Sequence, residues 1–190
     1  RVAVARRLGL PLPTVRARIG QVDFPAVHGD FSRFVTAHAG PASAADRVLP
    51  SDMPPETQES IRNALQAVRG LTGTTQRFEV VLDADISGRS CGLAVALAVY
   101  SQLTGRPLPD RLAATGQVLP DGRVDEVSDI PRKLRLRAEA RPGCWLLVPA
   151  DVIAPHEQIS PIRSLQHAIE LLGGPVGPDF EDAYRKTRNL

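Results

Sequence analysis

The sequence predicts a mixed α/β domain, and three segments carry this prediction. Phe78–Leu82 alternates and is rich in valine, which is typical of a strand with one buried face. Pro54–Gly70 repeats apolar residues at helical spacing along one face. Ser90–Leu103 is apolar almost throughout, which indicates a helix that is buried on most sides.

The composition is that of an ordinary globular protein. The 190 residues are enough for one domain with a buried core. Apolar residues make up 43%, charged residues 23% and aromatic residues 4%, so the core must consist of Leu, Val, Ile and Ala. The net charge of +2 is too small to indicate a dedicated polyanion-binding protein.

The cysteines and the apolar segments bear on the cellular setting. Cys91 and Cys144 each lie in an apolar run, so we expect two reduced core thiols, with a disulfide between them as the alternative. No apolar stretch is long enough to span a bilayer, and no signal-peptide pattern opens the sequence. We therefore expect a cytoplasmic protein without a membrane partner. Because the sequence begins at Arg1 without a methionine, we expect a fragment of a longer protein.

The first residues have two interpretations. In one, Val2–Leu8 and Thr14–Ile19 are short helices around a turn, reminiscent of a helix-turn-helix. In the other, a tail leads into a strand at Val15–Phe24. We favour the strand, because one short pair of helices cannot bury its own apolar face. Residues 1–13 are then a tail or a remnant of a preceding segment, and the domain runs over residues 14–190.

The other elements follow in chain order. Pro54 and Pro55 suit the first turn of the helix at Pro54–Gly70, and Gly70 suits the position just after its end. The remaining expected segments are a strand at Phe31–His38, loops at Ala39–Met53 and Asp83–Arg89, a hairpin of Leu112–Leu119 and Arg123–Val127 across an Asp-Gly turn, a helix at Asp129–Ala140, a strand at Cys144–Val148, and helices at Ile162–Leu172 and Phe180–Asn189.

Ser90 is the candidate nucleophile. It follows a glycine-containing loop and opens a buried helix, where the first backbone N–H groups lack partners. Such N–H groups can hold an oxyanion, and the positive helix end favours it. A serine also needs a base. The histidines show no catalytic motif, so no Ser-His-Asp triad is predicted from His28, His38, His156 and His167.

Lys133 is the candidate base. A lysine accepts a proton when it is neutral, and burial or nearby positive charge lowers its pKa. Arg132 and Arg137 flank Lys133 in sequence, and Arg89 lies next to Ser90. Serine–lysine pairs are a known variant of the catalytic triad. The alternative is that Ser90 only caps a helix and Lys133 belongs to a solvated basic face.

Two segments around Ser90 carry a family resemblance. The apolar run Ser90–Ala98 begins Ser-Cys-Gly, and Leu103–Pro107 reads Leu-Thr-Gly-Arg-Pro. Together they resemble the nucleophile helix of Lon peptidases, in which Ser-Ala-Gly opens an apolar helix that closes with Leu-Thr-Gly-x-Pro. The separation of 43 positions between Ser90 and Lys133 matches the Lon pattern without a gap.

Further motifs match in register. Ala114–Val118 and Asp121–Val124 resemble the Thr-Gly-Glu-Ile and Gly-x-Val hairpin of that family. Lys133-Leu134 followed by Leu146–Pro149 is similar to the lysine helix and its following strand, and Thr57–Ile61 is similar to the Gln-Glu-Ser helix. The resemblance covers about Pro55–Leu172, which we take as the core of the predicted domain.

The resemblance implies the Lon proteolytic-domain fold, with small mixed sheets packed against helices. It implies a serine endopeptidase in which Ser90 is the nucleophile, Lys133 the general base and Thr115 the residue that orients the lysine. The backbone N–H of Cys91 would help to hold the oxyanion. The family further implies unfolded polypeptide substrates and a homo-oligomer, expected as a hexameric ring.

Three departures from the family bear on activity. Arg89 replaces a proline beside the nucleophile, Cys91 replaces an alanine, and Gln117 replaces a glutamate. The sequence has no Gly-x-x-x-x-Gly-Lys-Ser/Thr loop, so we expect no ATP on this chain, and we expect no metal. An AAA+ ATPase in cis or in trans would supply unfolding. The alternative function is a catalytically silent Lon-fold module for oligomerisation or nucleic-acid handling, which the basic helix Arg132–Arg141 and the possible N-terminal helix-turn-helix favour. A small-molecule amidase or esterase has no specific support.

Overall fold

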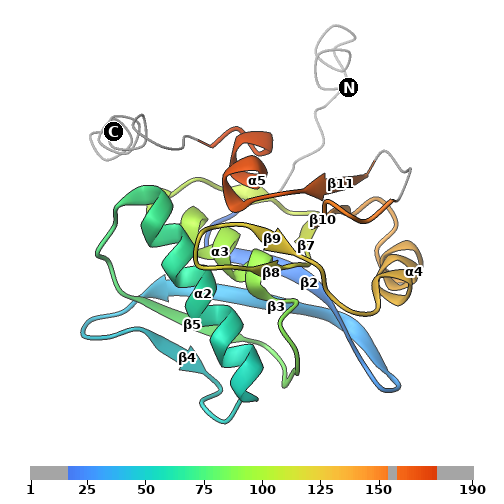
Figure 1. Cartoon of the computed structure of the whole chain (residues 1–190), viewed down its shortest axis with the longest axis horizontal. Coiled ribbons are helices and arrows are strands. Elements are labelled where there is room, and N and C mark those ends of the chain that lie inside the picture. Colours follow the sequence, from blue (N-terminus) through green and yellow to red (C-terminus); the bar gives the residue numbers. More distant parts are fainter. Residues whose placement is uncertain (1–16, 154–157, 175–190) are drawn as a thin grey trace, which may run out of the picture.

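The computed structural model describes residues 17–153 and 158–174. They form one seven-stranded sheet, two two-stranded sheets and the helices α2 to α5 (Figure 1). The predicted mixed α/β class is therefore confirmed. Residues 1–13, most of the helix-turn-helix interpretation and the terminal helix expected at Phe180–Asn189 lie outside the described residues.

The elements have the following bounds. The helices are α2 (Pro55–Thr72), α3 (Gly92–Thr104), α4 (Ile130–Ala140) and α5 (Leu165–Leu171). The strands are β1 (Ala17–Arg18), β2 (Gln21–His28), β3 (Phe31–Pro41), β4 (Arg47–Leu49), β5 (Phe78–Leu82), β6 (Leu108–Pro109), β7 (Leu112–Ala114), β8 (Gln117–Val118), β9 (Val124–Asp125), β10 (Trp145–Pro149) and β11 (Ile159–Ile162).

The main sheet is built around the hairpin of β2 and β3. Its strand order is β11-β10-β7-β2-β3-β5-β4. β2 pairs antiparallel with β3 from Gln21↔His38 to His28↔Phe31, and β3 pairs antiparallel with β5. The remaining pairings in this sheet are parallel. Since both central strands precede residue 55, the core of the domain is larger than the segment over which the family motifs were recognised.

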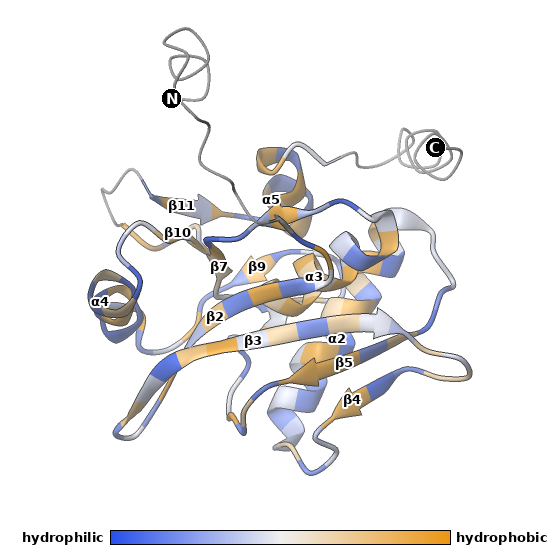
Figure 2. Cartoon of the chain, turned by 180° about the vertical axis from the view of Figure 1, so that it is seen from behind, coloured by the Kyte–Doolittle hydropathy of each residue, from blue (hydrophilic) through white to orange (hydrophobic). Residues whose placement is uncertain are grey.

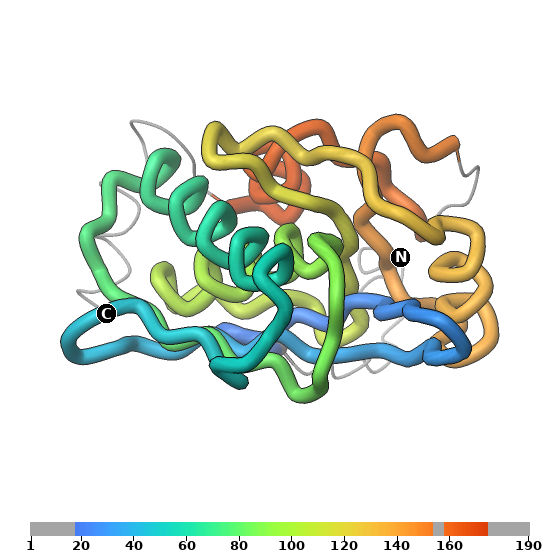
Figure 3. Tube along the Cα trace, turned by 60° about the horizontal axis from the view of Figure 1, so that its bottom comes forward, coloured from blue at the N-terminus to red at the C-terminus, as the bar shows by residue number. Residues whose placement is uncertain are grey.

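Helices α2 and α3 pack on the same face of this sheet (Figures 1 and 3). α3 contacts α2, β2 and β3, and its apolar residues are therefore buried all round, as the sequence predicted. Along β3, buried Val35, Ala37 and Ala39 alternate with more exposed residues. This alternation appears as bands of hydropathy along the strand (Figure 2). The buried face of β3 packs against the helices.

Several predicted boundaries were wrong. α2 continues past Gly70 to Thr72, because Gly73 (φ 68°) adopts the left-handed conformation that ends it. The loop expected at Ala39–Met53 contains β4, which pairs with β5. α5 begins later than expected, since the Ser164 hydroxyl accepts the N–H of His167 and fixes the helix start.

The region after α3 also differs. The strand expected at Leu112–Leu119 is divided into β7, in the main sheet, and β8, which pairs with β9 in the predicted hairpin. Between them Thr115 and Gly116 leave the sheet. β1 at Ala17–Arg18 contradicts a helix over Thr14–Ile19 at those two residues.

Both thiols are buried and unpaired, which confirms the prediction of two reduced cysteines. Within residues 17–153 and 158–174, no helix combines the length and the apolar character needed to cross a membrane.

Candidate active site

Ser90 lies in a turn that helix α2 holds in place. The Ser60 hydroxyl donates a hydrogen bond to the carbonyl of Arg89 at 2.7 Å, and the Thr57 hydroxyl donates to the carbonyl of Gly88 at 3.0 Å. Both hydroxyl-bearing residues are buried. They fix the backbone immediately before Ser90, so that the serine is presented at a defined position at the start of α3.

Four backbone N–H groups lie around Ser90, and two of them donate to carbonyl groups of the chain. Gly92 N–H donates to the carbonyl of Arg89 at 3.3 Å, and Leu93 N–H donates to the carbonyl of Gly116 at 3.0 Å. Within the described part of the chain, the N–H groups of Ser90 and Cys91 have no hydrogen-bond acceptor in another residue. Adjacent N–H donors at a helix start can bind a developing oxyanion.

Lys133 lies in the first turns of α4 and is 2% exposed. Its Nζ donates to the Thr115 Oγ1 at 3.3 Å. Burial lowers the pKa of Lys133 to about 8, although the Asp129 carboxylate opposes this by favouring the charged form, as the ionised form of Cys91 also would. A sizeable neutral fraction at mildly alkaline pH follows.

The cause of this low pKa differs from the one expected from the sequence. The sequence suggests neighbouring arginines as one cause, whereas burial is the main cause in the structure. The three arginines each have another partner: Arg89 pairs with Glu59 at 3.0 Å, Arg132 donates to the carbonyl of Gly29 at 2.7 Å, and Arg137 donates to the carbonyl of Cys144 at 2.9 Å. None of the three arginines is among the causes of the low pKa of Lys133.

The backbone of Ser90 and the amine of Lys133 meet at Thr115 and Gly116. Gly116 N–H donates to the carbonyl of Ser90 at 3.1 Å, and the preceding Thr115 accepts from Lys133. The Lys133 ammonium also opposes the effect of burial, which raises the pKa of Cys91 to about 11. No hydrogen bond joins Ser90 Oγ to Lys133 Nζ among the described residues, but the amine is near enough to Cys91, the residue after Ser90, to act on the pKa of its thiol.

Close packing fixes the start of α3. A Cβ added at Gly92 would lie 2.8 Å from the backbone N of Val118 and 2.9 Å from the Ser60 hydroxyl. Sequence reasoning missed Thr57 and Ser60 as supports of this turn. Their signal was two hydroxyls three positions apart on the buried face of α2, a spacing that places them on the same side of a helix.

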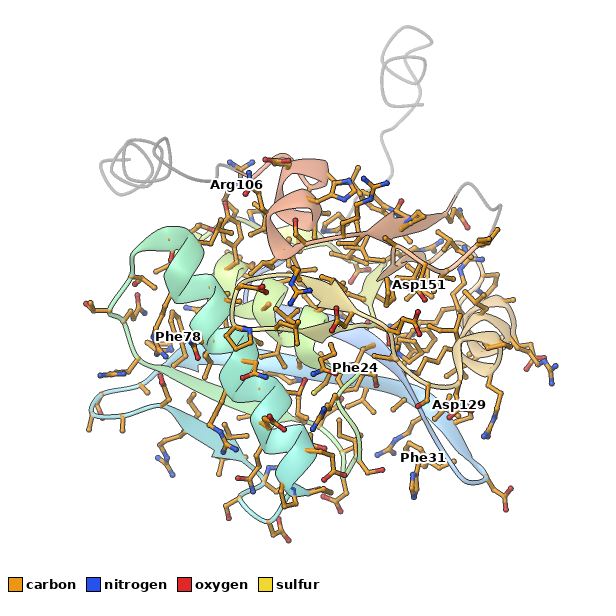
Figure 4. The ribbon with its side chains drawn as sticks, viewed as in Figure 1. Phe24, Phe31, Phe78, Arg106, Asp129 and Asp151 are labelled. Carbon is orange, nitrogen blue, oxygen red and sulfur yellow. The ribbon has the colours of Figure 1, made fainter. Side chains whose placement is uncertain are left out.

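A cavity of about 360 Å³ opens beside Ser90. The β2–β3 hairpin contributes Val27 and Phe31 to its wall, and the loop before the nucleophile contributes Ile86. Phe31, together with Asp129 at the start of α4, lies along the same edge of the molecule (Figure 4). The apolar wall suits an apolar side chain.

Two hydrogen bonds hold the hairpin against the site. His28 Nδ1 and the Ser87 hydroxyl share one at 3.0 Å, and the other runs from Arg132 to Gly29. The hairpin turn therefore connects the loop before Ser90 with the helix that carries Lys133. Among the described residues, no group of three or more His, Cys, Asp or Glu side chains is placed to hold a metal ion.

Comparison with known proteins gives one partial similarity. Over 72 residues, 38% of this chain, the sequence is 39% identical to a Lon protease from Clostridioides difficile (strain 630). The matched segment spans 9% of the length of that protease. No protein-family model matches the chain. The similarity indicates a Lon-like relationship over part of the chain.

Proposed function

We propose that this chain is a Lon-like serine peptidase with Ser90 as nucleophile and Lys133 as general base. The observation that carries the proposal is the buried amine of Lys133, which donates a hydrogen bond to Thr115. The next residue, Gly116, donates its backbone N–H to the carbonyl of Ser90. A buried lysine is costly unless its neutral form is used. The partial similarity to a Lon protease supports the same reaction class.

The reaction needs only groups of this chain and water. A neutral Lys133 amine keeps two N–H donors for neighbours such as Thr115 while its lone pair accepts the Ser90 proton. The Ser90 oxygen attacks the peptide carbonyl, and the oxyanion is held by the N–H groups of Ser90 and Cys91. The Lys133 ammonium then protonates the leaving amine. Finally, Lys133 takes a proton from the water that attacks the acyl group, and returns it to the Ser90 oxygen as the acyl–oxygen bond breaks and the carboxylic acid product leaves.

Substrates and assembly follow from the cavity and the resemblance. The apolar wall beside Ser90 favours an apolar substrate side chain next to the cleaved bond. Unfolded polypeptides, a homo-oligomeric ring and an AAA+ ATPase in cis or in trans are proposed from the likeness to Lon. In that arrangement ATP acts through the ATPase and not through this chain.

The test is cleavage of short fluorogenic peptides with an apolar residue before the cleaved bond, together with an unfolded casein. Short peptides need no unfolding, so the assay does not depend on an ATPase. We expect Ser90→Ala and Lys133→Met to abolish cleavage while circular dichroism stays unchanged, and the matched control Ser128→Ala to retain it. Cleavage that persists in Ser90→Ala would refute the assignment of the nucleophile.

The alternative of a silent scaffold is favoured by the basic helix and by a possible N-terminal helix-turn-helix, most of which lies outside the described residues. In the structure, Arg132 and Arg137 of α4 have acceptors within the chain, and Arg141 after it contacts Asp23, so the helix does not present one continuous basic stripe. The same assay decides. Absence of cleavage by the wild type, combined with salt-sensitive DNA binding, would favour the scaffold.

A further inference from the structure

A second cavity lies at the other end of α4. Its volume is about 440 Å³, and Arg18, Arg111 and Arg141 line it from three separate segments. Arg141 follows the last residue of α4, about 12 Å along the helix axis from Lys133 at 1.5 Å per residue. The cavity is thus distinct from the one beside Ser90, and the proposed peptidase reaction does not use it.

Two of these arginines are held in place by a buried carboxylate. Arg18 Nη1 donates to Asp23 Oδ2 at 3.0 Å, and Arg141 Nη1 donates to the same oxygen. The Thr36 hydroxyl donates to the other oxygen at 2.7 Å. The Arg141 guanidinium also lies over the Phe34 ring, 4.5 Å from its centroid. Both guanidinium groups are therefore positioned in advance and keep further N–H donors.

Ion pairing within the chain leaves positive charge uncompensated at this cavity. Asp23 is shared by Arg18 and Arg141, and Asp110 pairs with Arg18 at 3.1 Å. Arg111 is exposed, and its guanidinium group makes no hydrogen bond or ion pair with another described residue, although its backbone carbonyl accepts from Trp145 N–H at 2.8 Å. Arg111 lines the cavity without taking part in the ion pairs of Asp23 and Asp110, so those ion pairs do not explain its position.

Arg137 adds to this excess from below the surface. It is 4% exposed, and its acceptors are neutral groups, the carbonyl of Cys144 and the side-chain oxygen of Gln158. Arg141, Arg137 and Arg111 all act on the Cys144 thiol, where they oppose the effect of burial, which raises its pKa. Four arginines thus meet two carboxylates, and about two positive charges remain.

We propose that this cavity binds a ligand through a phosphate group, held by Arg111 together with the remaining N–H donors of Arg18 and Arg141. The planar guanidinium fork matches phosphate oxygens, and the charge of a phosphate group balances the excess. The cavity is larger than one phosphate, so it has room for an attached group. A long polyanion is less suitable, because Asp110 lies at the wall and the net charge of the whole chain is only +2.

The test is isothermal titration of the 190-residue chain with inorganic pyrophosphate and with AMP at low salt. Arg111→Gln is the decisive variant, because Arg111 is exposed and its loss leaves no buried carboxylate unpaired. Arg135→Gln is the matched control, an exposed arginine on α4 outside the cavity. We expect binding by the wild type and by Arg135→Gln, and at least ten-fold weaker binding by Arg111→Gln.

The probes also separate the sources of the phosphate. Tighter binding of AMP supports an esterified ligand, and tighter binding of pyrophosphate supports a free inorganic anion. No heat of binding with either probe, or an equal loss in Arg111→Gln and Arg135→Gln, would overturn the proposal. Because the readout is binding and not cleavage, either result leaves the assignment of Ser90 and Lys133 unaffected.

Discussion

Because Lys133 is buried, we expect the free energy of unfolding to increase as the pH rises above 8. Its pKa is about 8 in the folded chain, against 10.5 for an exposed lysine. Because the folded pKa is depressed, the charged lysine opposes folding. This penalty is complete well below pH 8 and is relieved as the pH rises from 8 to 10.5, where the folded chain has lost a proton that the unfolded chain still binds. The gap corresponds to about 3 kcal/mol, as an order of magnitude.

Lys133→Met removes the buried charge and keeps the length of the side chain. At pH 6.5 we expect the variant to gain about 3 kcal/mol from the lost penalty, less about 1 kcal/mol for the lost hydrogen bond to Thr115. At pH 9.5 much of the penalty has already gone in the wild type, so the advantage should shrink by about 2 kcal/mol. This difference does not depend on the cost of the lost hydrogen bond.

Urea unfolding followed by Trp145 fluorescence at pH 6.5, 8 and 9.5 measures this difference. Arg135→Met on the exposed side of α4 is the matched control and should track the wild type at each pH. If Lys133→Met also tracks the wild type, with a constant offset, then Lys133 ionises with an ordinary pKa. Lys133 would then be almost fully charged near neutral pH and could not act as the general base.

Three further predictions concern the site. Thr115→Val removes the acceptor of the Lys133 amine, and kcat for a short peptide should fall roughly ten-fold with little change in KM; an unchanged kcat would argue against an orienting role. Asp129→Asn should move the alkaline rise of the pH–rate profile to lower pH, because the carboxylate raises the pKa of Lys133, and asparagine tolerates the positive φ at this position; a profile that stays in place contradicts the assigned interaction. Arg132→Met frees the β2–β3 turn and should raise KM several-fold in the same steady-state assay, whereas Arg135→Met should not; equal effects would mean that the hydrogen bond from Arg132 to Gly29 does not shape the substrate cavity.

The elements that the sequence predicted well are those whose pattern is local. α3 is apolar almost throughout, and α4 begins at Ile130 directly after Asp129, with Pro131 in its first turn, so both were placed within two residues. β4 and the division between β7 and β8 were missed, because these depend on pairing with strands distant in sequence. A two- or three-residue strand carries too little alternation to be recognised alone.

In the candidate site, too, the features that the sequence did not predict depend on contacts between residues distant in sequence. The sequence nominated Ser90, Lys133 and Thr115, and the hydrogen bond from Lys133 to Thr115 is consistent with that choice. It could not show that burial, and not arginine charge, lowers the pKa of the lysine. The direction of a long arginine side chain depends on tertiary partners, such as the carbonyl of Gly29 for Arg132, that no local pattern encodes.

Two of the three departures from the Lon pattern, Arg89 and Cys91, are compatible with the proposed chemistry. The Arg89 side chain pairs with Glu59 on α2, and only its carbonyl takes part in the turn before Ser90. Cys91 is fully buried, and its pKa of about 11 keeps the thiol uncharged at any pH at which Lys133 titrates. A thiolate there would hold the lysine in its charged form. The neutral thiol adds volume without adding charge, so the N–H of Cys91 and the lone pair of Lys133 both remain usable in the proposed reaction.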